Sequence, residues 1–413
     1  MSIPGPFDTF TSGLVSIVRL TQGVTVTQTD PIQRSIKYLY DIENDRDCRQ
    51  VRERLTELDL CVTTVLPAAP NSKIWSTQKY PPPPPSSSSS SFTLPHMVLA
   101  NGQSLSGAAE ILDYLDTKYP SSQSTDTTDQ TLVATAKLIL LDLGNYLAEL
   151  LRYGRGRQVI TAARSDYPEQ PLLLYSYEGN QFCRLVREVL CELDVPYELR
   201  NAGKQSPRRA ELAKRGSTLC PFLVDPNTGT SMPESKEIVA YLYQTYARWT
   251  PPNEVLQWAS DVVLPTVRPL LTWVAQWQAG SRGADPEQYA QSIREAASQI
   301  EAMTVSHPVV VYTYDLSPFC TETKALLDRL KIEYKEVSLG LEWIPGLLKE
   351  PVLRAALLEN TGQSSLPHIF IGGESIGGLF SGTPGLVPLL EQHQLWNKLT
   401  AAQSKSNVFG KKS

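Results

Sequence analysis

The sequence has no C-x-x-C motif, although it contains six cysteines in 413 residues. Scattered cysteines provide neither a paired thiol-disulfide site nor the ligand spacing of a structural zinc site. We therefore expect no metal, and the lack of a disulfide framework favours a reducing compartment. The six are Cys48, Cys61, Cys183, Cys191, Cys220 and Cys320.

Basic charge and long apolar runs are also scarce. Lysine and arginine number 38 against 43 acidic residues, without a basic block, so we expect no nucleic-acid partner. No run of about 18 apolar residues is present, which predicts a soluble protein without a membrane span. The first 30 residues carry one basic residue, Arg19, and no apolar signal core, so no targeting peptide is identified.

What the sequence does contain is a threefold pattern. A tyrosine that ends a strand-like run is followed eight residues later by a cysteine that opens a helical pattern. Each cysteine is followed by a basic residue four positions later and by leucines seven and ten positions later. Matching offsets at three places predict three copies of one α/β unit. The cysteines are Cys48, Cys183 and Cys320, and the basic residues are Arg52, Arg187 and Lys324.

The copies divide the chain, and the length agrees with about three domains. We expect an N-terminal extension over 1–34, copy one over 35–120, copy two over 169–249 and copy three over 307–400. Helical spacers are expected over 121–168 and 250–306, and a flexible tail over 401–413. A proline and serine tract at 76–92 cannot bury apolar surface and is expected to be a disordered insert in copy one.

Each copy contains, in order, a strand, a cysteine that opens a helix, a second strand and a strand with an apolar-Pro-apolar motif. This order of elements describes the thioredoxin fold. Copy three resembles glutaredoxin, with Ser317-Pro318-Phe319-Cys320 at the C-P-Y-C site, Leu366-Pro367 at the cis-proline and Ile376-Gly377-Gly378 at the I-G-G turn. Copies one and two, over 7–246, are similar to the tandem glutathione S-transferase N-terminal-domain proteins of plants and cyanobacteria. The resemblance implies three tandem thioredoxin-like domains, glutathione as cofactor and a plastid location, the cytosol being the alternative.

Three residues before each cysteine, where such a site carries its attacking thiol, stand Asp45, Asn180 and Ser317. A helix N-terminus stabilises a thiolate mainly at that outer position, whereas the inner cysteine lies on the apolar stripe of its helix. The three cysteines are therefore expected to be chiefly core residues. Ser317 has two interpretations, a hydroxyl that stabilises glutathione thiolate or an ordinary helix N-cap. A carboxylate at Asp45 would repel a thiolate.

The resemblance also implies binding residues. Pro95, Pro221 and Pro367 stand at the cis-proline, which exposes the backbone of the residue before it to the cysteine of glutathione. In copy two this residue is Cys220, and in copy three it is Leu366, near Gly377 and Gly378. Glu234-Ser235 matches the pair that holds the γ-glutamyl group, and copy one has Gly107-Ala108 instead.

Three functions follow from these residues. The leading one is a transferase- or glutaredoxin-type protein that binds glutathione or a glutathionylated partner, with weak or degenerate activity. Its candidate catalytic residues are Ser317, Cys320 and Cys183. The second is a non-catalytic scaffold for a protein partner. The third is a thiol sensor, which requires Cys183 or Cys320 to be exposed. His96 and His368 are interpreted as strand histidines.

Overall fold

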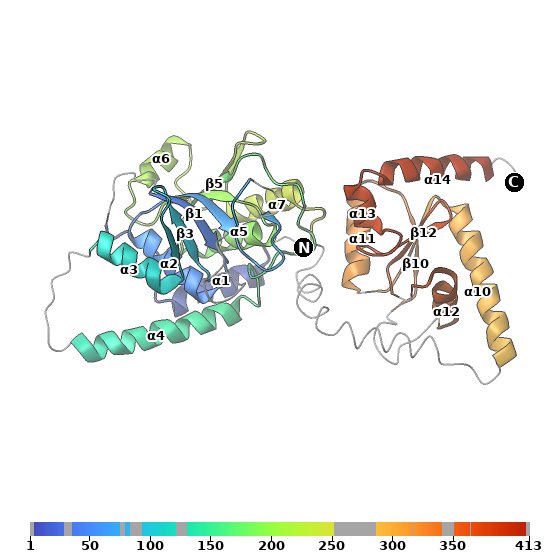
Figure 1. Cartoon of the computed structure of the whole chain (residues 1–413), viewed down its shortest axis with the longest axis horizontal. Coiled ribbons are helices and arrows are strands. Elements are labelled where there is room, and N and C mark those ends of the chain that lie inside the picture. The colour runs from blue at the N-terminus through green and yellow to red at the C-terminus, as the bar shows by residue number, and fades with distance from the viewer. Residues whose placement is uncertain are drawn as a thin grey trace. The chain divides into compact units, whose positions relative to one another are not determined.

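The computed structural model places the chain in two compact units, residues 1–248 and 249–413 (Figure 1). It describes residues 4–28, 35–74, 79–82, 93–120, 130–251, 286–315, 317–340, 351–363 and 365–409. Unit 1 contains copies one and two, and unit 2 contains copy three. The expected insert at 76–92 lies largely outside the described residues, as does most of the first half of the spacer expected at 250–306.

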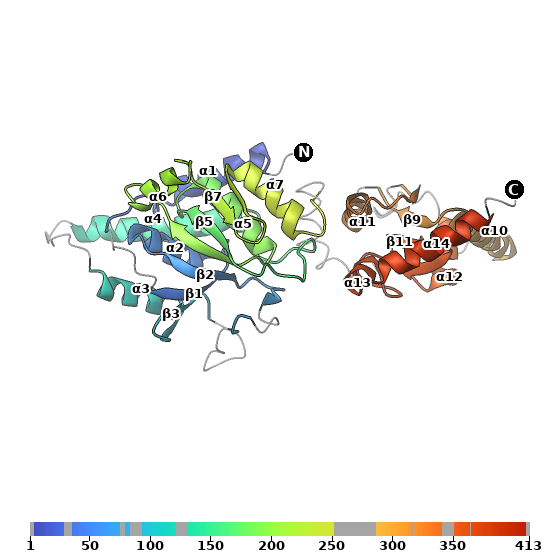
Figure 2. The ribbon, with the colours of Figure 1, turned by 90° about the horizontal axis from the view of Figure 1, so that it is seen from above.

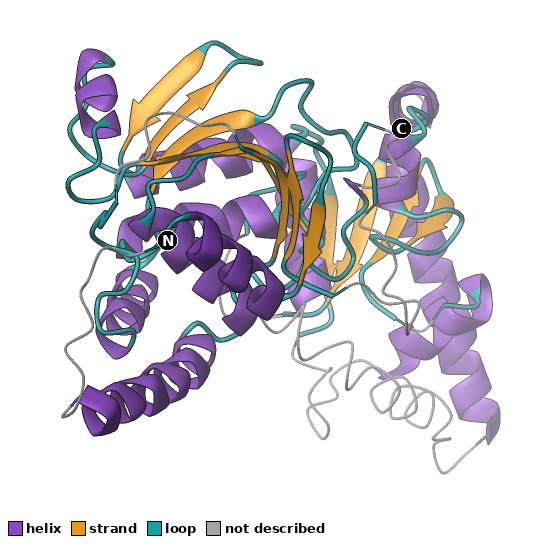
Figure 3. Ribbon diagram, turned by 60° about the vertical axis from the view of Figure 1, so that its left-hand side comes forward, coloured by secondary structure: helices purple, strands orange, loops and turns teal. Residues whose placement is uncertain are grey.

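One eight-stranded sheet runs through unit 1 in the order β4-β3-β1-β2-β6-β5-β7-β8 (Figure 3). The two halves of this order mirror each other, because each central strand, β1 or β5, has a parallel and an antiparallel neighbour. The halves join through antiparallel pairing of β2 with β6, where Val62 lies opposite Leu199. The strands are β1 (Ile36–Asp41), β2 (Val62–Pro67), β3 (His96–Leu99), β4 (Ser104–Ser106), β5 (Leu172–Ser176), β6 (Tyr197–Asn201), β7 (Phe222–Asp225) and β8 (Thr230–Pro233).

This joint changes the domain organisation that we expected. Copies one and two are halves of a single sheet rather than separate modules. The physical reason is that the edge strand of a lone copy exposes unpaired backbone N–H and C=O groups, which the edge strand of the other copy satisfies. The helices of unit 1 are α1 (Pro6–Val18), α2 (Arg46–Glu57), α3 (Ala108–Lys118), α4 (Gln130–Leu151), α5 (Gln181–Glu192), α6 (Arg208–Lys214) and α7 (Ser235–Tyr246).

Buried ion pairs connect the two halves reciprocally. Arg52 of copy one donates to Glu178 of copy two at 2.8 Å. Arg187, at the matching position of copy two, donates to both oxygens of Glu43 of copy one at 2.9 Å. Arg187 also reaches Glu178 at 2.6 Å, and Arg52 reaches Asp41. Because all these groups are buried, the loss of one partner would leave an uncompensated charge in the interior.

The segments expected as an extension and a spacer are matching parts of the two halves. Arg19, just after α1, pairs with Glu53 at 2.7 Å, and Arg152, just after α4, pairs with Glu188 at 2.6 Å. Four residues after each arginine, a glycine with positive φ lies against the other half. A Cβ on Gly23 would lie 2.9 Å from Glu178, and one on Gly156 would lie 3.0 Å from Glu43. The repeat of unit 1 therefore begins with α1 and with α4.

Unit 2 has a four-stranded sheet in the order β10-β9-β11-β12. The strands are β9 (Val309–Thr313), β10 (Lys335–Ser338), β11 (His368–Ile371) and β12 (Glu374–Gly377). Its described helices are α10 (Pro286–Ser306), α11 (Pro318–Arg329), α12 (Pro351–Thr361), α13 (Leu386–Glu391) and α14 (Leu395–Phe409). The central strand β9 is buried along its whole length, which explains its unbroken apolar run.

Two further boundaries differ from expectation in unit 2. The spacer expected to reach residue 306 includes α10, whose Ile293 and Ile300 belong to the buried core around Val310. The tail expected from residue 401 continues as α14 to Phe409, with Ala402 buried against Gly372. Figure 2 shows α14 beside β11. Apolar residues at helical spacing in both segments find a sheet to cover, so tertiary packing extends the domain at both ends.

Candidate functional site

Strand pairing brings a helix start and a cis-proline to one end of the sheet in all three copies. Tyr312 at the end of β9 lies opposite His368 at the start of β11. The loop that leads to α11 and the Leu366–Pro367 peptide are therefore neighbours, and the same pairing occurs in unit 1. The bonds preceding Pro95, Pro221 and Pro367 are all cis, as predicted, and Thr383–Pro384 is a fourth cis bond that the sequence did not indicate.

Ser317 stands at the N-cap position of α11 with extended backbone angles (φ −72°, ψ 124°). Its side chain is 8 % exposed. In the part of unit 2 that the structure describes, its hydroxyl makes no capping bond to the helix. The first N–H groups of a helix have no partner within that helix, so this end retains both its donors and the positive end of its dipole. An anionic sulfur placed here would meet the N–H groups and the hydroxyl together.

Cys320 points inward from the same helix and is fully buried. The backbone N–H of Tyr314 lies 3.3 Å from its Sγ. Burial raises the pKa of the Cys320 thiol to about 11, although the nearby Ser317 hydroxyl favours the thiolate. The sulfur is thus protonated at neutral pH and inaccessible in this conformation. The prediction that this cysteine is a core residue is confirmed, and its catalytic role stays a prediction.

The equivalent helix starts of unit 1 are closed. The Asn180 side chain accepts from the N–H groups of Phe182 at 2.8 Å and Cys183 at 3.0 Å. Asp45 caps α2 in the same way, at 3.0 and 2.9 Å. Cys183 and Cys48 are fully buried, and burial raises the pKa of both thiols. The sensor interpretation needs an exposed Cys183 or Cys320, and neither thiol is exposed in this conformation.

Copy two keeps other features of the predicted groove. Cys220 is half-buried before the cis-proline Pro221, and burial raises the pKa of its thiol to about 12. Ser235 opens α7 and is buried. Glu234, its N-cap, is a non-glycine residue at φ +70°, a conformation that costs roughly 1–3 kcal/mol. At the matching position copies one and three have glycine, Gly107 and Gly385.

Sequence reasoning missed one cation beside this groove. The Arg209 guanidinium lies 5.6 Å from the centre of the Tyr177 ring, and the Tyr177 hydroxyl accepts from Asn180 at 2.8 Å. The positive charge of Arg209 favours the thiolate of Cys220, although burial outweighs it. Arg209 is on α6, a seven-residue helix whose sequence RRAELAK lies outside the repeated pattern and gave no signal.

In unit 2, Gly377 and Gly378 lie close to the cis-proline. A Cβ on Gly378 would lie 3.2 Å from the carbonyl oxygen of Pro367. Gly377 has φ +90°, and a Cβ there would lie 2.4 Å from Gly382, so only glycine permits this close approach of two chain segments. The structure places Gly378 beside Pro367 and Gly377 opposite Ile369 on β11, while ligand binding by these glycines and by Leu366 stays a prediction.

The two strand histidines are buried and uncharged. The Nε2 of His368 lies 2.7 Å from the Ser375 hydroxyl on β12, and its ring stacks on Phe370. Burial lowers its pKa to about 4. His96 pairs with Ser106 on β4 at 2.7 Å, and burial lowers its pKa as well. Both serve as strand residues that bridge to the neighbouring strand, which agrees with the interpretation from sequence.

The described residues form neither a metal-binding cluster nor a membrane-spanning helix. Within these residues, no group of three or more histidine, cysteine, aspartate or glutamate side chains could hold a metal ion. None of the helices that they form has both the length and the apolar content to cross a membrane.

Two family models match the chain in the regions just described. The model of the glutathione S-transferase N-terminal domain matches residues 174–252, and the glutaredoxin model matches residues 309–376. The first covers copy two and the second the greater part of copy three, which includes Ser317, Cys320 and Pro367.

Curated glutaredoxins are similar to unit 2. One from Ricinus communis is 38 % identical over 102 residues, which are 24 % of this chain and 95 % of that protein. A chloroplastic glutaredoxin of Oryza sativa subsp. japonica is 35 % identical over 102 residues, 24 % of this chain and 73 % of that protein. Among solved structures, a buckwheat glutaredoxin–glutathione complex is 27 % identical, with a TM-score of 0.24, over 27 % of this chain and 94 % of that one.

Proposed function

Because the chain belongs to the glutaredoxin family through unit 2, and carries a glutathione S-transferase N-terminal domain in unit 1, we propose that it binds glutathione or glutathionylated proteins at α11. The observation that carries this proposal is Ser317, which stands at an uncapped helix start beside the cis peptide of Leu366 and Pro367. Its hydroxyl and the first N–H groups of α11 together stabilise a glutathione thiolate.

The chemistry of this site follows from the atoms present. A serine hydroxyl cannot form the mixed disulfide through which glutaredoxin-type exchange passes. Cys320 has a sulfur, but its pKa of about 11 keeps it a thiol and the core encloses it. The proposed activity is therefore binding and activation of the glutathione thiol, as in a transferase, with disulfide exchange weak or absent. Oxidoreduction through Cys320 would require α11 to move.

We assign the cysteine part of glutathione to the backbone of Leu366 beside Pro367, and its carboxylate ends to the turn at Gly377 and Gly378. The second proposed groove is in copy two, around Cys220, Pro221, Glu234 and Ser235. Its support is the unfavourable φ of Glu234, since strained backbone persists where the surroundings impose it, often at binding sites. Cys183 lies beneath the closed helix start there, so its catalytic role is the least supported.

Calorimetric titration of glutathione into the full chain tests both grooves. Wild type is expected to bind, Ser317→Ala to lose the unit 2 site, and Glu234→Ala to lose the copy two site. Ser292→Ala on α10, an exposed hydroxyl away from both grooves, is the control and should bind as wild type. Unchanged binding by Ser317→Ala would contradict the assignment of α11.

A non-catalytic scaffold remains the second candidate function. The observation that favours it is that the Asp45 and Asn180 side chains cap their own helices. At two of the three helix starts, the N–H groups that would bind a ligand are therefore bonded to the protein itself. This reading also treats copy one as a third thioredoxin-like domain retained for its surfaces. If wild type shows no heat of glutathione binding up to millimolar concentration, the scaffold is the better account.

We also propose that the protein works in a plastid. The support is the resemblance of copies one and two to plant and cyanobacterial tandem proteins, and the chloroplastic rice glutaredoxin similar to unit 2. Expression of the full chain with a C-terminal fluorescent protein in leaf cells tests this. Fluorescence that coincides with chlorophyll is expected, and fluorescence confined to the cytosol would contradict it.

A further inference from the structure

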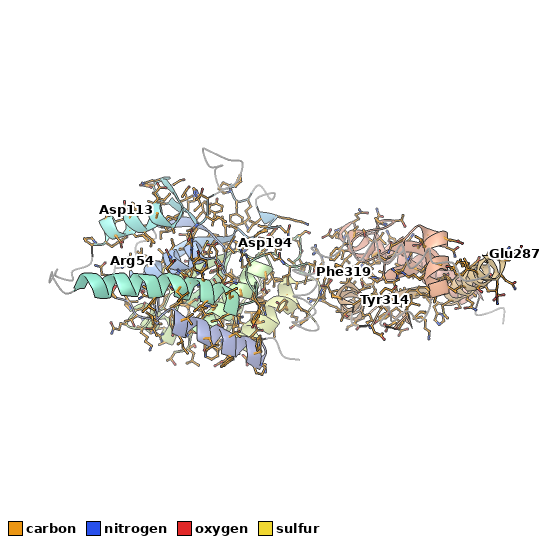
Figure 4. All side chains as sticks on the ribbon, turned by 90° about the horizontal axis from the view of Figure 1, so that it is seen from below. Arg54, Asp113, Asp194, Glu287, Tyr314 and Phe319 are labelled. Atoms are coloured by element: carbon orange, nitrogen blue, oxygen red, sulfur yellow. The ribbon has the colours of Figure 1, made fainter. Side chains whose placement is uncertain are left out.

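Two helices of unit 1 form a close antiparallel pair. The rings of Phe7 on α1 and Tyr153 just after α4 are 5.8 Å apart, while at the other end a Cβ on Gly144 would meet the carbonyl oxygen of Val18. Figure 4 shows α1 and α4 side by side on the near side of unit 1. Arg19 and Arg152, which follow the two helices, bind this pair to α2 and α5 through the buried carboxylates of Glu53 and Glu188.

The outward face of this pair, here called the α1–α4 face, is apolar and exposed. Ten large apolar side chains on it are between 40 % and 71 % exposed. At roughly 150–250 Å² for each aromatic ring, and somewhat less for an aliphatic chain, they present on the order of 1,000 Å². Monomeric proteins rarely expose contiguous apolar patches above about 300–600 Å². The ten are Phe7, Phe10, Ile17, Leu20, Leu140, Leu143, Tyr146, Leu147, Leu150 and Tyr153.

The spacing on this face indicates what covers it. On α4 the exposed leucines at 140, 143, 147 and 150 follow the alternating 3-4-3 spacing of a helix–helix seam. On α1 the residues at 7, 10, 14 and 17 follow the same spacing. Two adjacent helices that each present such a seam are half of a four-helix bundle, and they need two more helices of the same kind.

We propose that the α1–α4 face is the dimer interface of this protein, and that the same face of a second copy covers it in an isologous four-helix bundle. A two-fold axis supplies two helices with the required spacing. The available area fits, since a stable interface buries about 800 Å² on each partner. The inference does not depend on glutathione binding, because the face is formed by residues outside both proposed grooves.

Charge disfavours a lipid surface as the occupant. Helices that lie on membranes carry lysine and arginine along their polar face. The sequence of α1 contains neither, and that of α4 contains only Lys137. Arg19 and Arg152, which follow the two helices, are buried in ion pairs with Glu53 and Glu188. Arg46, whose guanidinium lies 5.1 Å from the Tyr146 ring, is already paired with Asp47 and Asp142, so it adds little attraction to anionic headgroups.

Analytical ultracentrifugation of the full chain tests the proposal. Wild type is expected to sediment as a species of twice 45.8 kDa. The double variant Leu143→Glu/Leu150→Glu places four charges in the seam of the dimer, and its dissociation constant should rise about 100-fold or more. Because both leucines are exposed and glutamate favours helix, the monomer should remain folded, which circular dichroism checks. Trp396→Glu on α14, an exposed apolar residue of unit 2, should leave the dimer intact.

Other occupants give other results, and each overturns the proposal. A monomeric wild type at about 100 μM would show that the face has no second copy. A monomer that floats with phosphatidylcholine vesicles would point to lipid. A monomer in which Leu150→Cys cross-links within its own chain would point to an internal segment or to unit 2. A dimer unaffected by the double variant would place the interface elsewhere.

Discussion

The helix starts of unit 1 and unit 2 differ in one side chain at one repeated position. Asp45 and Asn180 bond to the N–H groups that open α2 and α5, whereas Ser317 leaves the start of α11 uncapped. The cation four residues after each cysteine differs as well. Arg52 and Arg187 each pair with a carboxylate of the other copy, Glu178 and Glu43. Lys324 instead pairs with Glu336 of its own unit at 2.9 Å. The same framework thus supports assembly in unit 1 and retains an open helix end in unit 2.

The largest effect is expected from replacing an arginine that pairs with a carboxylate of the other copy. Arg187→Met removes one of the two buried arginines that pair with Glu43 and Glu178, so that Arg52 alone faces both carboxylates, and should destabilise unit 1 by about 3–5 kcal/mol. Lys324→Met, at the matching position of unit 2, removes a half-exposed pair and should cost about 1 kcal/mol or less. Urea-dependent hydrogen exchange of β5 and β9 peptides measures the two units separately. Equal losses would contradict the difference between the units.

The next effect is the acid sensitivity of unit 2 through His368. Its pKa is about 4 in the folded protein and about 6.5 when unfolded, so the unfolded state binds the proton first as pH falls. The stabilisation is complete above pH 6.5 and should decrease by about 3 kcal/mol down to pH 4.

Labelling of Cys320 by an acid-tolerant disulfide reagent reports this unfolding, because it is the one cysteine after residue 220. His368→Phe, which introduces the residue that copy two has as Phe222, should flatten the dependence between pH 4 and 6.5. A slope that persists in this variant would assign the acid sensitivity to another group.

A smaller effect is expected when the helix start of unit 2 receives the capping residue found in unit 1. Ser317→Asn gives α11 the capping residue of α5 and should stabilise unit 2 by about 1 kcal/mol. The same change places the asparagine amide where the glutathione thiol is proposed to bind, so glutathione binding to unit 2 should weaken about tenfold. Calorimetry and thermal unfolding measure the two changes. Stabilisation without loss of binding would separate capping from the site.

The smallest effect concerns the strained residue of copy two. Glu234→Gly adopts the φ of +70° without strain and should stabilise unit 1 by about 1 kcal/mol, with weaker glutathione binding at copy two. Glu237→Gly, within α7, is the control and should instead destabilise by about 1 kcal/mol. Loss of stability in Glu234→Gly would mean that its side chain makes contacts that outweigh the strain.

Local chemistry made part of this structure predictable. The buried cysteines, the cis-prolines and the caps at Asp45 and Asn180 each depend on a few neighbouring residues, so their pattern is visible in sequence. The joint between β2 and β6 is not visible, because it depends on two edges more than 130 residues apart in sequence. The sequence did not reveal that α1 and α4 begin the two repeats of unit 1. The pattern that these two segments share is only an arginine followed four residues later by a glycine, as in Arg19 and Gly23.

The shared sheet of unit 1 also constrains how the chain folds during synthesis. The α1 helix, near residue 12, bonds to the backbone of Gln181, and the edge of β2 stays open until β6 ends at Asn201. At about 5–20 residues per second, some 10 seconds or more pass between the emergence of the first helix and of its partners. Copy one must spend that interval with an unpaired edge and an apolar helix exposed, and is therefore the part of the nascent protein most in need of a chaperone.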